Sequence, residues 1–217
     1  MDITKARRNV IEQQVRPWGG LNLRANQALS DVPRENFVPE GFQGLVFADI
    51  EIPLSDNAKM FSPKIEGRIL DSINIQGDES VLEIGTGSGY FTAVLGKLAD
   101  SVVSIEIDQA LSASAKKNID ALAINNVDLQ VSDASTADFS KQKFDVIVLG
   151  CSLNAQSQKL NELLNTGGRL FAIIGSKNKM QATLTTRLGD NEWQAKSIFE
   201  THLDYMQGQE PTAVFAF

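Results

Sequence analysis

The chain has 217 residues, of which 42% are hydrophobic and 22% charged, a composition ordinary for one globular unit with an elaboration at one end. Its 20 basic and 27 acidic residues leave a formal net charge of −7, which argues against a broad phosphate-binding face for nucleic acid. There is no apolar run of the roughly 18 residues that a membrane span needs and no signal segment, so we expect a cytoplasmic protein. The single cysteine, Cys151, excludes a disulfide within the chain.

The N-terminal part of the chain is predicted to be mainly helical. Residues 4–15 carry apolar side chains at helical spacing, and a Gly-Gly pair then breaks the chain. Asn22 can cap a second, short helix, which ends before Val32-Pro33 because the residue before a proline disfavours helical backbone. Residues 37–61 show no clear period, so we expect irregular structure with one short strand.

A third helix is predicted to begin at a Ser-Pro pair. Ser62 is a favoured N-cap residue, and Pro63 suits the first helical position because its fixed φ is already helical. Glu66 falls in the first turn, where the helix dipole favours a negative charge. We expect this helix to continue to about residue 73.

From residue 79 onward, strand-like and helix-like segments alternate. The predicted strands are 81–84, 102–107, 127–131, 144–149, 169–174, 194–203 and 211–217, and the predicted helices are 89–98, 109–122, 155–164 and 178–187. Such alternation gives right-handed crossovers and a mostly parallel sheet with helices on both faces, and the last two strands would form an antiparallel edge. The predicted fold class is therefore α/β, a Rossmann-like sheet preceded by an N-terminal helical segment.

Residues 81–90, Val-Leu-Glu-Ile-Gly-Thr-Gly-Ser-Gly-Tyr, read as a buried strand, a Gly-x-Gly-x-Gly turn and the start of a helix. Glycines permit positive φ and let the backbone approach a ligand where a Cβ would collide. The ligand would lie at the carboxyl end of the first strand, the usual position in open α/β sheets. The dinucleotide-binding pattern Gly-x-Gly-x-x-Gly would need a glycine where Tyr90 stands.

Two carboxylates indicate which ligand binds there. Glu106 closes the second strand, 21 residues beyond Gly85, where a carboxylate reaches the two ribose hydroxyls of an adenosine. Glu83 precedes the turn, where it would repel a pyrophosphate but attract the ammonium and sulfonium of S-adenosylmethionine (SAM). The alternatives are a salt-bridged strand end for Glu83 and an exposed charge for Glu106. Together these features favour SAM over NAD and predict a SAM-dependent methyltransferase.

Asp133 follows the third strand, where it could accept a hydrogen bond from the adenine amino group, although an Asx turn explains it nearly as well. We identify no metal-ligand pattern. The predicted cofactor-binding residues are Glu83, Gly85, Thr86, Gly87, Ser88, Gly89, Glu106, Ile107, Asp133 and Ala134.

Several stretches resemble the protein-L-isoaspartate O-methyltransferase family. Residues 32–39 (Val-Pro-Arg-Glu-Asn-Phe-Val-Pro) are similar to a signature of its N-terminal segment, and residues 48–54 to the stretch that follows. Residues 103–107 resemble its ribose-binding strand and residues 166–170 a later strand entry. The resemblance covers about residues 8–175. It implies methyl transfer from SAM to the free α-carboxylate of isoaspartyl residues in damaged proteins or peptides.

The chain departs from this family at the acceptor site. The family carries Ile-Ser-x-Pro, whose serine hydroxyl lies beside the substrate carboxylate, and alignment on Pro63 puts Phe61 at that serine position. Ser62 could supply the hydroxyl after a shift of one residue, so we take Ser62 as the candidate catalytic residue, beside its simpler explanation as an N-cap. A phenyl ring donates no hydrogen bond to a carboxylate, so we predict weak or absent activity on isoaspartyl peptides unless Phe61 packs into the core.

Two other functions stay open from the sequence: a methyltransferase of the same fold that acts on another, small or apolar acceptor, and a SAM-binding protein without turnover. In either case we divide the chain into two parts of one compact unit. Residues 1–76 form a helical segment on the substrate side, and residues 77–217 form the SAM-binding domain.

Overall fold

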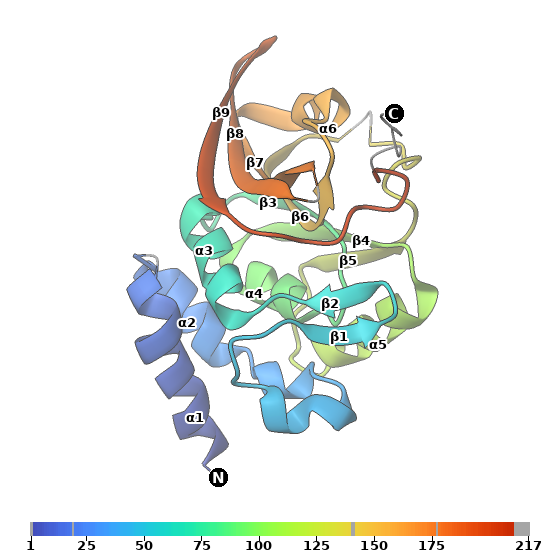
Figure 1. Cartoon of the computed structure of the whole chain (residues 1–217). Coiled ribbons are helices and arrows are strands. Elements are labelled where there is room, and N and C mark those ends of the chain that lie inside the picture. The colour runs from blue at the N-terminus through green and yellow to red at the C-terminus, as the bar shows by residue number, and fades with distance from the viewer. Residues whose placement is uncertain (1, 19, 140–141, 177, 211–217) are drawn as a thin grey trace.

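The computed structural model describes residues 2–18, 20–139, 142–176 and 178–210 (Figure 1). Its α-helices are α1 (Ile3–Val10), α2 (Leu23–Asp31), α3 (Pro63–Ile73), α4 (Tyr90–Leu98), α5 (Gln109–Asp120) and α6 (Gln158–Glu162). Its strands are β1 (Ile52–Ser55), β2 (Ala58–Met60), β3 (Ser80–Ile84), β4 (Ser101–Glu106), β5 (Val127–Val131), β6 (Phe144–Leu153), β7 (Leu164–Ser176), β8 (Lys179–Gly189) and β9 (Glu192–Glu200). Short π- or 3₁₀-helical turns lie at Ile11–Val15, Arg16–Trp18, Arg34–Asn36 and Glu40–Leu45.

Seven strands form one sheet in the order β5-β4-β3-β6-β7-β8-β9. The first five in this order are parallel, whereas β8 and β9 are antiparallel to their neighbours. The predicted α/β class, with a mostly parallel sheet and an antiparallel edge, is therefore confirmed. The strand order reverses between β3 and β6, so the crevice at the carboxyl ends of these two strands is where ligands bind in such sheets.

The two faces of the sheet bury separate apolar clusters, because alternate strand residues point to opposite sides. On one face, Val81 of β3 and Phe171 of β7 belong to the same cluster as Leu70 of α3 and Leu95 of α4. On the other face, Leu82 of β3 lies in a cluster that α6 helps to cover. The N-terminal helices join the first cluster: α3 packs against β7, and α2 packs against α3 and α4, so the segment before residue 77 covers this face of the sheet (Figure 1). Among the described residues, we find no helix with the length and apolar character that a bilayer crossing requires.

Several N-terminal predictions agree with the structure. A continuous helical segment made of α1 and a π-helical turn covers residues 3–15. Asn22 caps α2 through its Oδ1, which accepts a hydrogen bond from the Ala25 N–H at 2.8 Å. The helix α3 begins at Pro63, with Ser62 in the N-cap position. The segment before it contains two short strands, β1 and β2, which form an antiparallel hairpin instead of the single strand expected.

The helix predicted at residues 178–187 is wrong, because this segment is strand β8. Its Ala and Leu residues are good helix formers, but buried side chains at Met180 and Ala182 follow a strand period, and the threonines are β-branched. Gly175, with φ of +141°, pairs with Met180, and a Cβ at Gly175 would lie 2.1 Å from the Lys179 carbonyl oxygen. The antiparallel edge therefore consists of β8 and β9, and the strand predicted at 211–217 lies outside the described residues.

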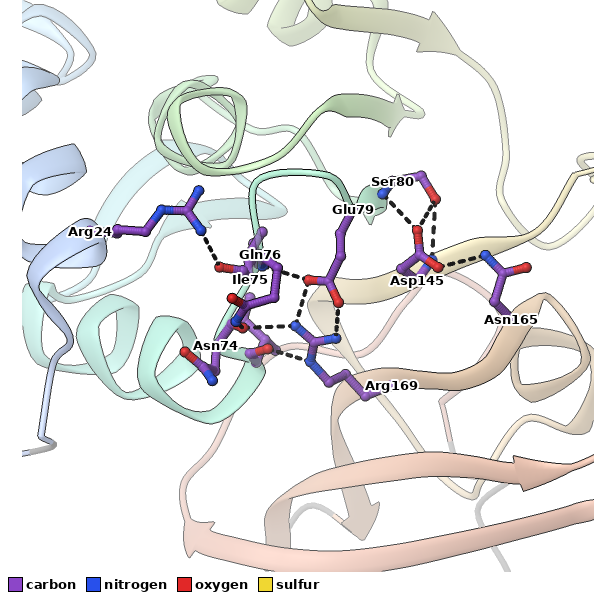
Figure 2. Close-up of polar contacts among 10 residues, drawn as sticks. Arg24, Asn74, Ile75, Gln76, Glu79, Ser80, Asp145, Asn165 and Arg169 are labelled. Carbon is purple, nitrogen blue, oxygen red and sulfur yellow. Dashed lines mark hydrogen bonds and ion pairs between the residues drawn. The ribbon is translucent and has the colours of Figure 1, made fainter.

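The amino ends of the central strands carry a polar network that includes an ion pair between Arg169 and Glu79 (Figure 2). Arg169 of β7 donates two hydrogen bonds to the Glu79 carboxylate, at 2.7 and 2.8 Å, and others to the backbone carbonyls of Ile73 and Asn74. Asp145 of β6 accepts hydrogen bonds from the backbone and hydroxyl of Ser80 and from the Asn165 amide. These residues fasten the strand starts to one another.

Candidate cofactor and acceptor site

The glycine-rich turn joins β3 to α4 at the opposite, carboxyl edge of the sheet. Gly85, Gly87 and Gly89 have φ of +97°, +56° and +82°, a backbone region that residues with a Cβ rarely adopt. At Gly89 a Cβ would also lie 2.9 Å from the Ala115 Cβ, so α5 packs directly against the turn. The three glycines therefore permit a conformation in which backbone amides, rather than side chains, face a ligand.

Glu106 is held beside this turn at the end of β4. Its Oε2 accepts a hydrogen bond from the Gly87 N–H at 2.8 Å, and its Oε1 accepts one from the Asp108 N–H at 3.0 Å. Glu106 is only 6% exposed, so the alternative of an exposed charge is wrong. Asp108 instead caps α5 by accepting hydrogen bonds from the N–H groups of Ala110 and Leu111. Of these two acidic residues, Glu106 is the one that contacts the turn, and its ribose contact stays a prediction.

Two exposed apolar side chains lie near Glu106: Ile107, which follows it in the chain, and Val131, which ends the neighbouring strand β5. Ile107 is 48% exposed and Val131, at the end of β5, is 53% exposed, which leaves apolar surface where a flat adenine could lie. Asp133 forms an Asx turn, which was the alternative to an adenine contact: its Oδ1 accepts a hydrogen bond from the Ser135 N–H at 2.8 Å. The interactions with Ser135 lower the pKa of the Asp133 carboxyl. Adenine contacts by Asp133 and the half-buried Ala134 stay predictions.

Glu83 lies at the end of β3 and is 1% exposed. Its Oε2 accepts hydrogen bonds from the hydroxyls of Thr92, at 2.5 Å, and Ser104, at 2.6 Å. Burial raises the pKa of Glu83 to about 7, the two hydroxyls oppose this, and the negative charge of Glu106 adds to it. No Lys, Arg or His of the described residues forms an ion pair with Glu83, so the salt-bridge alternative is not what the structure shows.

A hollow opens beside Glu83 and the turn, and the hairpin β1–β2 and the start of α3 close its other side. Five predicted cofactor-binding residues line it, from Glu83 to Ser88, whereas Gly89, Glu106, Ile107, Asp133 and Ala134 lie outside its lining. The lining residues are Leu54, Lys59, Met60, Phe61, Glu66, Glu83, Gly85, Thr86, Gly87, Ser88, Tyr90, Phe91 and Gly150. The N-terminal segment thus supplies one wall and the sheet the other.

Phe61 both lines this hollow and packs against the core. Its half-buried ring meets the Phe91 ring edge to face, with centroids 6.0 Å apart and an interplanar angle of 77°. Ser62 is buried, makes no side-chain capping hydrogen bond, and is absent from the lining of the hollow. The catalytic role predicted for Ser62 stays a prediction, and its N-cap role is one of position only.

A buried ion pair between Arg34 and Glu66 supports this wall, and sequence reasoning missed it. Arg34 Nη1 donates to Glu66 Oε1 at 2.5 Å, and Arg34 Nη2 donates to the Phe61 carbonyl at 2.7 Å. The guanidinium also stacks 5.0 Å from the centroid of the Tyr90 ring. Burial raises the pKa of Glu66 to about 7, although Arg34 opposes this. Glu66 lies on the apolar face that α3 buries. A carboxylate on such a face needs a partner, so its position in the sequence could have indicated a buried ion pair.

These features fit SAM, a ligand with an adenosine at one end and two positive charges at the other. Glu106 and the glycine turn would hold the ribose, and Glu83 offers a buried negative charge to the cationic end. A pyrophosphate would instead bring negative charge against Glu83, which is unfavourable at low dielectric.

Comparison with known protein families agrees with this description. A family model for protein-L-isoaspartate(D-aspartate) O-methyltransferases matches residues 7–205. A protein-L-isoaspartate O-methyltransferase from Syntrophus aciditrophicus is 34% identical over 187 residues, which cover 86% of each chain. Protein-L-isoaspartate O-methyltransferase 2 from Marinobacter nauticus is 33% identical over 210 residues, which cover 96% of each chain.

Solved structures show the same fold. A structure described as a protein-L-isoaspartate O-methyltransferase from Plasmodium falciparum, in complex with S-adenosyl-L-homocysteine, superposes with a TM-score of 0.81 at 18% identity. That match covers 93% of this chain and 98% of the other. A second protein-L-isoaspartate O-methyltransferase superposes with a TM-score of 0.82 at 22% identity and covers 95% of this chain and 66% of the other.

Proposed function

Since this chain belongs to the protein-L-isoaspartate(D-aspartate) O-methyltransferase family and is a SAM-dependent methyltransferase, we propose that its acceptor is the free carboxylate of an isoaspartyl residue in a protein or peptide. One observation carries the proposal. The hollow beside Glu83 and the glycine turn is closed by Phe61, in the segment that aligns with the acceptor-binding motif of the family. Methyl donor and acceptor can therefore meet inside one hollow.

The chemistry asks little acid–base work of the protein. SAM supplies an electrophilic methyl group on a sulfonium, and a carboxylate is already an ionised nucleophile at neutral pH, so no general base is needed. The chain's residues have to hold the two reactants in line and exclude water. Glu106 and the glycine turn orient the cofactor side, while Leu54, Phe61 and Phe91 form an apolar boundary around the point of transfer.

Phe61 makes this activity slow. The ring occupies lining surface where the family has a hydroxyl, so the acceptor carboxylate loses one charge-assisted hydrogen bond and part of its solvation. If that bond acts in the transition state, its loss of about 1.5–3 kcal/mol slows transfer roughly ten- to hundredfold. Phe61→Ser should therefore raise the rate of isoaspartyl methylation by a similar factor.

The experiment measures methyl transfer from labelled SAM to an isoaspartyl peptide and to its normal aspartyl twin. Phe61→Leu is the matched control, because it shortens the side chain without adding a hydroxyl, and it should leave the rate low. Wild-type turnover equal to that of a family enzyme assayed in parallel would contradict the slowing effect of Phe61. Turnover on neither peptide, even by Phe61→Ser, would contradict the isoaspartyl acceptor.

Ser62→Ala tests the catalytic role predicted for Ser62. Because the hydroxyl neither caps α3 nor lines the hollow, we expect kcat/KM to change less than about twofold. A fall of tenfold or more would support the predicted role.

A second candidate function is methylation of another acceptor. The apolar lining residues Leu54, Met60, Phe61 and Phe91 favour a small or apolar acceptor group. Labelled SAM added to a cell extract, followed by separation of proteins from small molecules, distinguishes this candidate: label in small molecules alone would support it.

We also propose protein repair in the cytoplasm as the biological setting, with residues 1–76 as the acceptor-side segment and residues 77–217 as the SAM-binding domain. The support is the family membership together with the acceptor-side wall that the hairpin and α3 provide. Cell fractionation and the isoaspartyl content of proteins in a deletion strain test this setting.

A further inference from the structure

Lys59 of β2 is the one Lys, Arg or His among the described residues that line the hollow. The other ionisable lining residues are Glu83, Tyr90 and Glu66, and the charge of Glu66 is paired with Arg34, so Glu83 is the lining carboxylate without a counter-charge. A carboxylate acceptor that enters such a hollow meets this like charge at low dielectric, which is unfavourable. The positive charge at Lys59 is therefore the feature that can favour an anionic acceptor over a neutral one.

The ammonium of Lys59 already binds a carboxylate from this chain. Its Nζ lies 2.7 Å from Asp204 Oδ2 and 3.8 Å from Glu51 Oε2. The hydrogen bond to Asp204 is the main reason that the pKa of Lys59 lies above its ordinary value, so this side chain is charged at neutral pH. Both partners remain partly exposed, at 38% for Lys59 and 54% for Asp204. The pair is therefore placed where an incoming carboxylate can compete with Asp204.

Asp204 is brought to this position by the segment after β9, which is fastened to the end of β6. Ser152 donates a backbone hydrogen bond to the Asp204 carbonyl at 2.9 Å and accepts one from the Met206 N–H at 2.8 Å. The Ser152 hydroxyl donates to the Leu203 carbonyl. The Asp204 side chain thus stands beside Lys59 on a fixed backbone, as an internal carboxylate bound to a residue that lines the hollow.

We propose that Lys59 binds the acceptor carboxylate, in exchange for Asp204, and so contributes to acceptor affinity, while the transition-state hydrogen bond that Phe61 cannot make stays absent. Lys59 and Phe61 are two residues apart, and both line the hollow. An ammonium donates up to three hydrogen bonds and carries a full charge, so it can bind a carboxylate where no hydroxyl is available. This proposal rests on the proposed function, because it assumes that the acceptor is a carboxylate.

The test measures binding of a fluorescent isoaspartyl peptide to enzyme saturated with S-adenosylhomocysteine, a readout that does not depend on turnover. A twin peptide in which that carboxylate is amidated measures the contribution of its charge. We expect Lys59→Met to weaken binding of the acid peptide by about three- to tenfold and to leave the amidated twin unchanged. Lys59→Arg should retain most of the affinity, and Asp204→Asn should strengthen it about two- to threefold because the competing carboxylate is gone.

Lys116→Met is the matched control, because Lys116 forms a surface ion pair with Asp120 on α5 and takes no part in the hollow. Melting temperatures and the Kd for SAM verify that each variant is folded. If wild type prefers the acid peptide and Lys59→Met keeps that preference, the Lys59 proposal alone is overturned. If wild type does not distinguish acid from amide, the carboxylate acceptor itself is refuted, and the role of Lys59 with it.

Discussion

Burial affects the pKa of carboxylates differently at the two ends of the central sheet: Glu79 and Asp145 at the amino end have lowered pKa values, and Glu83 at the carboxyl end has a raised one. At the amino end, burial raises the pKa of Glu79, but Arg169 and a backbone N–H outweigh it, and the pKa lies below its ordinary value. The pKa of Asp145 also lies below its ordinary value, because hydrogen bonds from Ser80 and Asn165 outweigh the effect of burial (Figure 2). At the carboxyl end, Glu83 has hydroxyl partners only, and its pKa is raised to about 7.

This difference separates a structural network from a binding site. The amino end satisfies its charges within the protein, so its ion pair contributes to stability and has nothing left to offer a ligand. The carboxyl end keeps a buried carboxylate without a counter-charge, which costs free energy in the unliganded protein. We expect a cationic cofactor to offset that cost when it binds, so that part of the free energy of SAM binding would come from the desolvation of Glu83 in the unliganded protein.

Among the variants that test this difference, Glu83→Gln is expected to change SAM affinity the most. The neutral amide cannot attract the cationic end of SAM, so the Kd for SAM at pH 8 should rise roughly a hundredfold, a loss of about 3 kcal/mol of binding free energy. The unliganded protein should become more stable by about 1–2 kcal/mol, because a buried charge is gone. Calorimetric titration and denaturant unfolding measure the two effects. Loss of stability with unchanged SAM binding would mean that Glu83 is structural.

Glu106→Ala should weaken SAM binding by about 1.5–3 kcal/mol, the scale of hydrogen bonds to a charged group. Asp108→Ala is the control: it removes the cap of α5, so it should cost about 1 kcal/mol of stability and leave the Kd for SAM within twofold of wild type. The same titration decides between them. If Asp108→Ala weakens SAM binding and Glu106→Ala does not, the ribose contact is assigned to the wrong residue.

Glu79→Gln makes the same chemical change at the opposite end of the sheet. It leaves Arg169 without its bidentate partner, so the free energy of unfolding should fall by about 2 kcal/mol. SAM binding should be unchanged within twofold, since the network lies away from the cofactor edge. The same change from Glu to Gln is therefore expected to raise the free energy of unfolding at residue 83 and to lower it at residue 79. If both variants are stabilised, or both are destabilised, the distinction between the two ends is wrong.

The pH dependence sharpens the comparison further. Because the Glu83 pKa is about 7 in the folded chain against an ordinary 4.5, the unfolded state ionises first, and unliganded stability should fall as pH rises between these values. SAM favours the ionised carboxylate, so its affinity should rise up to about tenfold per pH unit below pH 7 and level off above. Calorimetry at several pH values measures this trend. Glu83→Gln should flatten the curve; a curve that persists would assign the titration to Glu66.

The parts of the fold that the sequence predicts well are those in which local signals agree. The Gly85–Gly89 turn, the strand before it and the carboxylate 21 residues later all require one arrangement, so the strand, the turn and the position of Glu106 beside it could be predicted, while the cofactor contacts of these residues stay predictions. The segment at 178–187 carries conflicting local signals, because Ala and Leu favour a helix while its threonines favour a strand. Pairing with β7 decides the outcome, and that pairing is not local.

The acceptor side could be predicted less completely, for the same reason. Arg34 and Glu66 are 32 residues apart and meet only when the N-terminal segment folds over the sheet. Lys59 and Asp204 are 145 residues apart. Neither pair has a spacing that indicates contact, whereas the alignment of Phe61 with a family serine was visible because it rests on consecutive residues.

The close approach of Gly85 and Gly150 has a consequence for protein engineering. A Cβ at Gly150 would lie 2.8 Å from the Gly85 carbonyl oxygen, which is backbone and cannot move aside cheaply. Any side chain at residue 150 would therefore push against the backbone of Gly85 and distort the glycine-rich turn. A library that aims to reshape the hollow for new acceptors can vary the side chains of Leu54, Met60 and Phe61, which line it, but it should keep Gly150 fixed even though that residue lines the same space.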